Sequence, residues 1–168
     1  MISEQSGKTE GRVRVLIFDR ATLDGLTFKR SGDGMLFVPE EIEPEFDSGW
    51  CGNLVVNTGK QLTQNQVFGL TATPVTKSEV GDSSAVPTVG QTALQGGSTA
   101  SQNFDSAPVL TGNVITCQST FAGGSTAFQW LEAGMFTAGG VMLDRVIGFG
   151  DPTPGGSAAI LAWTYTQN

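Results

Sequence analysis

The chain has 168 residues and a formal net charge of −7, and it contains no histidine. This length predicts one domain with a sizeable core, and the lack of histidine excludes catalytic machinery built on Ser/His/Asp or Cys/His. The acidic balance argues against a nucleic-acid partner, because binding to a phosphate backbone needs clustered Lys and Arg.

The N-terminal residues 1–11 are polar and lack periodicity, which predicts a flexible arm. We expect a single β domain over residues 12–168. It begins with a strand at 12–18, where arginines alternate with apolar residues, so that one face of the strand is expected to be exposed to solvent. Shorter strands are expected within 21–38, around a turn at 31–34. The polar start shows no signal peptide, so synthesis in a cytoplasm is expected.

Residues 39–47 place five acidic side chains among nine residues. Carboxylate oxygens are the ligands of divalent cations, so a metal site is one interpretation of this stretch. The two prolines, Pro39 and Pro44, and the lack of a D-x-D-x-D-G spacing favour a solvated acidic loop instead. We therefore predict no bound metal and no other cofactor.

The middle of the chain predicts a strand at 53–57 and one short helix, Lys60–Leu70, in which Leu62, Gln66 and Gly69 follow helical spacing. Residues 71–107 are rich in loop signals, and such a long loop region is either functional or covered by a neighbour. Strands resume at 109–110 and 113–120. Cys117 lies in the latter and is expected to be a small buried apolar residue. Two cysteines do not make a disulfide framework, and no apolar run is long enough to cross a membrane.

The last third predicts a hairpin and a terminal strand. A strand at 128–135 leads to the turn 137–140, whose Gly139 and Gly140 supply residues that tolerate positive φ. A second strand follows at 141–147, and residues 158–166 alternate as a strand does. Across the hairpin, Glu132 and Arg145 are expected to form a structural ion pair. The alternative is a pair of catalytic carboxylates, Glu132 and Asp144, as in glycosidases.

Aromatic side chains concentrate in the same region. We predict that four of them pack in the core or in a subunit interface: Trp130, Phe136, Trp163 and Tyr165. The alternative is a sugar-binding platform formed by Trp50, Trp130, Trp163 and Tyr165, because aromatic faces stack on sugar rings.

Charge is unevenly placed along the chain. Residues 1–48 hold six of the nine Lys and Arg and ten of the sixteen Asp and Glu. The remaining 120 residues must therefore cover their surface with neutral polar groups or with another protein, since soluble monomers usually carry about 25% charged residues. A protein that assembles with copies or partners fits this composition, and a Ser/Thr-rich secreted β domain is the alternative.

Four segments in order carry a family resemblance. They are Asn53-Leu54-Val55-Val56-Asn57-Thr58-Gly59, Val80-Gly81-Asp82-Ser83-Ser84-Ala85-Val86-Pro87 with Thr92-Ala93-Leu94, Glu132-Ala133-Gly134-Met135-Phe136, and Gly140-Val141-Met142-Leu143-Asp144-Arg145. Together they resemble small virion structural proteins of tailed bacteriophages, over roughly residues 50–166. The chain departs from the pattern in having Gly81-Asp82 where Gly-Thr-Gly is usual.

The resemblance implies a place in a virion and no particular chemistry. With the strand pattern, it leads us to expect an all-β antiparallel sandwich, jelly-roll or Greek-key-like, with at most one short helix. The expected function is non-enzymatic: binding to the phage capsid or tail as a decorating or cementing homo-oligomer, with a trimer favoured. The alternative is a receptor- or glycan-binding module of a tail fibre.

Overall fold

The computed structural model describes residues 9–19, 29–30, 36–37, 43–71, 73–122 and 127–167. In chain order the elements are β1 (Thr9–Phe18), β2 (Lys29–Arg30), β3 (Leu36–Phe37), β4 (Phe46–Asp47), β5 (Cys51–Gly52), β6 (Leu54–Val55), α2 (Asn57–Val67), β7 (Val75–Gly81), β8 (Thr99–Asn103), β9 (Val109–Thr111), β10 (Val114–Phe121), β11 (Glu132–Thr137), β12 (Asp144–Ile147) and β13 (Ala158–Gln167).

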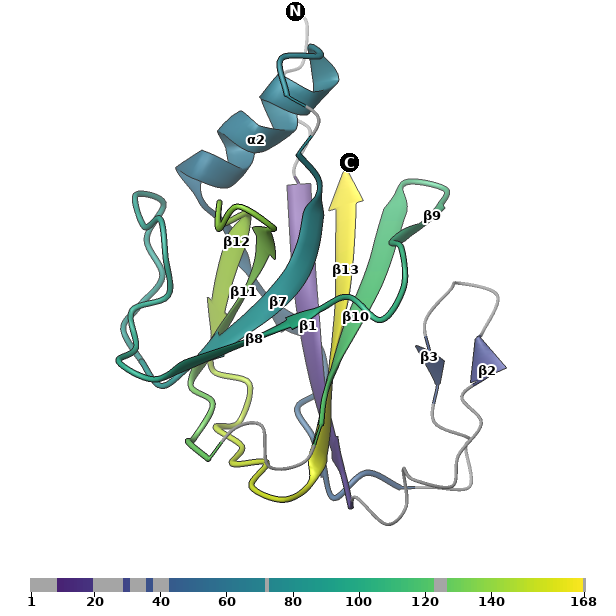
Figure 1. Ribbon diagram of the computed structural model, residues 1–168, viewed down its shortest axis with the longest axis vertical. Coiled ribbons are helices and arrows are strands. Elements are labelled where there is room, and N and C mark those ends of the chain that lie inside the picture. Colours follow the sequence, from purple (N-terminus) through teal and green to yellow (C-terminus); the bar gives the residue numbers. More distant parts are fainter. Residues whose placement is uncertain are drawn as a thin grey trace, which may run out of the picture.

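Two antiparallel sheets make up the fold, as predicted (Figure 1). The first has the order β4-β1-β13-β10-β9, with β5 also pairing with β1, and the second has the order β6-β12-β11-β7-β8. The short β2–β3 pair stands apart from both. Because consecutive strands are often in different sheets, the chain crosses repeatedly between the layers, and the architecture is an all-β sandwich.

The first and last strands lie side by side in the first sheet. β1 pairs with β13 over its whole length, with Val13 opposite Trp163. The predicted arm is therefore shorter than residues 1–11, because residues 9–11 belong to β1. Residues 1–8 lie outside the described residues. Alternate side chains of both strands face the second sheet, as strand periodicity requires.

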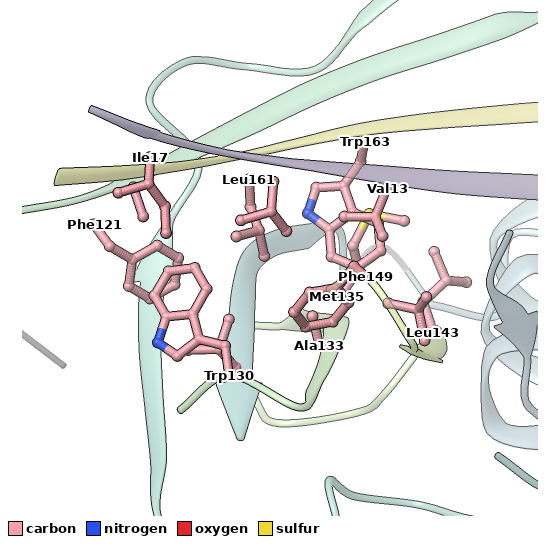
Figure 2. Close-up of a cluster of buried hydrophobic side chains, with 14 residues drawn as sticks. Val13, Ile17, Phe121, Trp130, Ala133, Met135, Leu143, Phe149, Leu161 and Trp163 are labelled. Atoms are coloured by element: carbon pink, nitrogen blue, oxygen red, sulfur yellow. The ribbon is translucent and has the colours of Figure 1, made fainter. Parts of the chain in front are cut away.

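The main core fills the space between the two sheets (Figure 2). Trp163, Leu161 and Val13 enter it from the first sheet, and Ala133 and Met135 enter it from the second. Phe121 and Trp130 meet edge to face, with ring centroids 4.9 Å apart, an arrangement that aromatic quadrupoles favour.

The predicted hairpin is present, with two corrections. Its first strand begins at Glu132 rather than 128. The Trp130 amide donates to the carbonyl of Pro152, which lies in a loop, and the Leu131 amide donates to Gly81 at the end of β7. Trp130 therefore lies outside the strand and packs in the main core, and the second strand begins at Asp144 rather than at 141. In the turn, only Gly140 has positive φ, at 82°.

The single helix of the described residues is α2, which starts at Asn57, before the predicted Lys60, and ends at Val67. Gly59 is buried against β12, where a Cβ would collide with the carbonyl of Leu143. Gly69, with φ of 69°, follows the end of the helix and stops its continuation as Gly commonly does. Within the described residues, no helix is long and apolar enough to cross a membrane.

Candidate functional site

The expected ion pair between Glu132 and Arg145 is present and fully buried. Arg145 Nε donates to Glu132 Oε2 over 2.6 Å, and neither side chain is exposed. Two charges removed from water need further hydrogen bonds to offset their desolvation. The other hydrogen-bond partners of Glu132 and Arg145 therefore show which part of the fold the pair stabilises.

Those partners all lie in residues 82–98, the loop that joins β7 to β8. The backbone amides of Gln95 and Gly96 donate to the Glu132 carboxylate, at 2.9 and 2.6 Å from Oε1. Arg145 Nη1 donates to the Ala85 carbonyl over 2.7 Å and to Gln91 Oε1 over 3.1 Å. The pair thus anchors both halves of the loop, which we call the anchored loop.

A second contact closes the anchored loop at its base. The Ser98 amide donates to Asp82 Oδ1 over 3.1 Å, and this hydrogen bond lowers the pKa of Asp82. Gly96 sits where a Cβ would collide with Asp82 and Glu132, so this position requires glycine. The sequence predicted that the long loop region would be functional or covered by a neighbour. Over residues 82–98, hydrogen bonds to side chains of the same chain hold the loop in place.

Asp144 is the neighbour of Arg145 in β12, and its side chain points the opposite way, as successive strand residues do. It is fully buried, and burial raises the pKa of its carboxyl to about 7. The Met135 amide donates to Oδ1 over 2.9 Å, and the Asn53 side-chain amide donates to Oδ2. Both partners are neutral, so at neutral pH this carboxyl is poised between its charged and protonated forms.

The glycosidase alternative for Glu132 and Asp144 is contradicted by this geometry. Such a pair must reach a sugar and a water molecule between its carboxyl groups. Here both side chains have zero exposure, and the Glu132 carboxylate is already occupied by Arg145 and two backbone amides. These two residues serve the fold and not a reaction with an external substrate.

The predicted core aromatics are largely internal. Trp130, Phe136 and Trp163 are buried, and Tyr165 is half-buried and packs against the core. A sugar platform made from all four proposed aromatics is therefore excluded, because two of its tryptophans have no exposed surface. Trp50 alone among the three tryptophans is exposed, at 40%.

Trp163 also joins the two sheets through a polar contact. Its Nε1 donates to Ser78 Oγ over 2.9 Å, and Ser78 and Ser119 hydroxyls lie 2.8 Å apart. Ser119 Oγ donates in turn to the Gln102 carbonyl. This internal chain satisfies the indole donor, as buried polar groups require.

The described part of the acidic stretch is used in local contacts. Arg14 makes two hydrogen bonds to Asp47, at 2.9 and 2.5 Å, which lower the pKa of that carboxyl. Ser157 donates to Glu45, and residues 39–42 lie outside the described residues. Among the residues that the structure describes, no group of three His, Cys, Asp or Glu is placed to hold a metal ion.

Sequence reasoning missed an apolar cleft at the end of the sandwich where α2 and β9 lie (Figure 1). It has a volume of about 290 Å³ and opens between α2, β7, β10 and β13. Among its lining residues are Leu62, Val75, Phe104, Ile115 and Tyr165, and none of those lining it carries a charge. Cys117 also lines it, partly exposed. The run Val67-Phe68-Gly69-Leu70 at the end of the predicted helix was the available signal.

Further large apolar side chains are exposed in segments that adjoin the cleft-lining residues in sequence or in the sheet. Val67, Phe68 and Leu70 follow the cleft-lining turn of α2, and each is about three-quarters exposed. Leu110 is 67% exposed and pairs across β9–β10 with Ile115, which lines the cleft. Directly opposed strand residues share a face, so Leu110 lies on the same side of the sheet as Ile115. We call these five residues the apolar end.

Comparison of the chain with family models, curated proteins and solved structures found no match.

Proposed function

We propose that the protein is a non-enzymatic structural component of a tailed-phage virion, which assembles as a homo-oligomer, favoured to be a trimer, on the capsid or the tail. The virion part of this proposal is supported by the four ordered sequence segments that resemble phage virion proteins. The assembly part is supported by the apolar end, which is the observation that carries the proposal.

An exposed cluster of this kind is unusual for a protein that stays monomeric. Single exposed apolar residues are normal, but contiguous ones mark interaction sites. Val67, Phe68 and Leu70 lie within four positions of one another and expose most of their surface. Covering them, together with Leu110 and Ile115, would supply the apolar centre that association surfaces have.

The charge distribution makes a second copy a suitable occupant. A chain with net charge −7 repels its own copies wherever acidic surfaces meet. The cleft lining carries no charged residue, and neither does the segment of residues 61–70, which includes the end of α2. Contact through these residues therefore places no acidic side chains of their own against each other.

The exposed side chains of Val67 and Leu70 and the apolar cleft are also compatible with a closed ring of several chains. If the side chains of Val67 and Leu70 of one copy enter the cleft of the next, the interface is head-to-tail, and such interfaces close into rings when the rotation permits. The resemblance to phage decoration and fibre proteins, which often occupy threefold positions, is the reason for proposing a trimer. The cleft, with a volume of about 290 Å³, can accept aliphatic side chains, and filling it would bring this end closer to the dense packing of a protein interior.

The virion part is tested by quantitative mass spectrometry of purified particles of the phage that encodes the chain. We expect the protein to stay on washed particles at a fixed number of copies, in multiples of three. Its absence from particles, with abundant protein free in the lysate, would contradict a structural role. Binding of added recombinant protein to particles that lack it would separate decoration from assembly during particle formation.

The receptor- or glycan-binding alternative is favoured by one observation, the exposed Trp50 beside a groove. No residue that lines this groove lines the apolar cleft or belongs to the apolar end, so the two functions are compatible in one molecule.

A further inference from the structure

A second concave surface lies between the start of β1, the segment that carries Trp50, and the first turns of α2. This groove has a volume of about 630 Å³. Glu10 and Arg12 line it from β1, Trp50 and Gly52 from the β4–β6 region, and Lys60 from α2. Unlike the apolar cleft, it combines one aromatic ring with charged side chains.

The floor of the groove is kept open by glycines. Gly52 stands opposite Arg12 in the β1–β5 register, and a Cβ added to Gly52 would meet no atom within 4 Å. The absence of a side chain there leaves space beside Arg12 that a ligand can enter. Gly11 is required for a different reason, because a Cβ at that position would overlap the side chain of Asn53.

The loop that carries Trp50 is held in place by the sheet. The Gly49 amide donates to Asp47 Oδ1 over 2.9 Å, and Asp47 is itself paired with Arg14. The Val15 amide donates to Ser48 Oγ over 2.8 Å. Gly49 has φ of 63°, a conformation that glycine adopts without strain. The indole is therefore presented by an anchored turn, which lowers the entropy lost when a ligand binds.

Charged side chains line the groove beside the ring. Arg12 and Glu10 approach no closer than 3.8 Å, and the Arg12 side chain is 59% exposed. Lys60 of α2 adds a second cation to the lining. Arg and Lys both donate hydrogen bonds. A ring with an apolar face and oxygen atoms around its edge would use the indole and both cations at once.

We propose that this groove binds a saccharide. One face of the sugar ring stacks on Trp50, and Arg12 and Lys60 donate to its oxygen atoms. Glu10, Arg12 and Lys60 together carry an excess of one positive charge in the lining, which favours a carboxylate-bearing sugar over a neutral one. This site is independent of the proposed assembly surface, and either can fail without the other.

Tryptophan fluorescence provides a specific readout, because Trp130 and Trp163 have no exposed surface and only Trp50 is open to solvent. The full chain is titrated with sialyllactose, chitotriose and maltotriose, and quenching by iodide is measured at each step. We expect sialyllactose to shield Trp50 from quenching most strongly. No change with any of the three sugars would overturn the proposal.

Two variants test the site without removing the fold. Gly52→Leu fills the groove while Trp50 remains as the reporter, and it should abolish shielding. Gly90→Leu is its matched control, since Gly90 also has open space around it but lies in the anchored loop, and it should bind as the unchanged chain does. Equal binding by both variants would contradict a site in this groove.

Substitution of Trp50 distinguishes stacking of the sugar on the indole from nonspecific binding of the sugar to the protein surface. Trp50→Ala should weaken sialyllactose binding at least about tenfold in calorimetry, since the stacking surface is lost, and Trp50→Phe should recover part of it. Phe68→Ala, which removes an exposed ring from the apolar end, should leave binding unchanged. A loss with Phe68→Ala equal to that with Trp50→Ala would place sugar binding elsewhere and overturn the proposal.

Discussion

Arg145 donates to Glu132 over 2.6 Å with neither side chain exposed, and each of the two residues also makes a hydrogen bond to the backbone of the anchored loop. Glu132→Gln and Arg145→Met should each lower the free energy of unfolding by about 3–5 kcal/mol, because each leaves a buried charge without its partner.

The double variant should cost less than the sum of the two single changes by about 0.5–3 kcal/mol, as coupled neighbours do. Urea unfolding measures all three. The control is the pair Arg14→Met and Asp47→Asn, whose side chains are about one-third exposed, and there each change should cost about 1 kcal/mol or less. Strict additivity at Glu132 and Arg145 would show that the two charges do not interact.

Loss of the Glu132 charge should also loosen the anchored loop selectively. In Glu132→Gln the amide hydrogens of Gln95 and Gly96 lose a charged acceptor, and charge-assisted hydrogen bonds are the strong ones. Hydrogen exchange followed by NMR should show faster exchange at these two amides. The Ser98 amide, which donates to Asp82, is the internal control, and equal acceleration at Ser98 would indicate global loosening instead.

Asp144 should make stability fall as pH rises from about 5 to 8. Its pKa is raised to about 7 in the folded chain, so the folded state binds a proton that the unfolded state has already released in this range. The contribution is fully present below the ordinary pKa of 3.8, declines as pH rises above it, and is lost once pH has passed the folded pKa. The chain has no histidine, which removes the usual titrating group from this window.

Asp144→Asn should remove this pH dependence and raise stability at pH 8. The amide can still accept from the Met135 amide, and the Asn53 oxygen, which has no partner among the described residues, can accept from its NH₂ group after a flip of the Asn53 side chain. Thermal melts at pH 5, 6.5 and 8 give the comparison. An unchanged pH slope in the variant would assign the dependence to another group.

The buried hydrogen bond from the Trp163 indole to the Ser78 hydroxyl should contribute to the stability of the fold. Ser78→Ala leaves the buried Trp163 donor unsatisfied, which costs about 1–3 kcal/mol. Trp163→Ala should cost about 3–5 kcal/mol, as truncation of a buried Trp does. Chemical denaturation at 25 °C distinguishes them, and a neutral Ser78→Ala would show that Ser119 alone satisfies the indole.

Much of this fold could be predicted from local sequence signals. The alternation over residues 158–166 gave β13, and two hydrophobic runs around a glycine turn gave the β11–β12 hairpin with its Glu132–Arg145 pair. These features are local, or depend on a turn of a few residues. Period-two alternation decides which side chains share a face, so opposite charges on paired strands were a sound basis for an ion pair.

Features that depend on distant segments could not be predicted in this way. Trp130 leaves the strand pattern because its amide donates to Pro152, which is far along the chain. The sequence around Asp144 does not indicate that its carboxyl is buried. The burial and the hydrogen bond from Asn53 come from segments that are distant in the chain. The apolar cleft arises where α2 meets the ends of β10 and β13, and no single stretch of sequence contains it.

Association of copies of the chain through the apolar end can be measured by size-exclusion chromatography with multi-angle light scattering. Val67→Lys and Val86→Lys are a matched pair, because both valines are 73% exposed but Val86 lies in the anchored loop. The unchanged chain and Val86→Lys should each have about three times the 17.5 kDa chain mass, and Val67→Lys should have the mass of one chain. A monomeric unchanged chain, or a Val67→Lys variant that keeps the full oligomer mass, would contradict assembly through this surface.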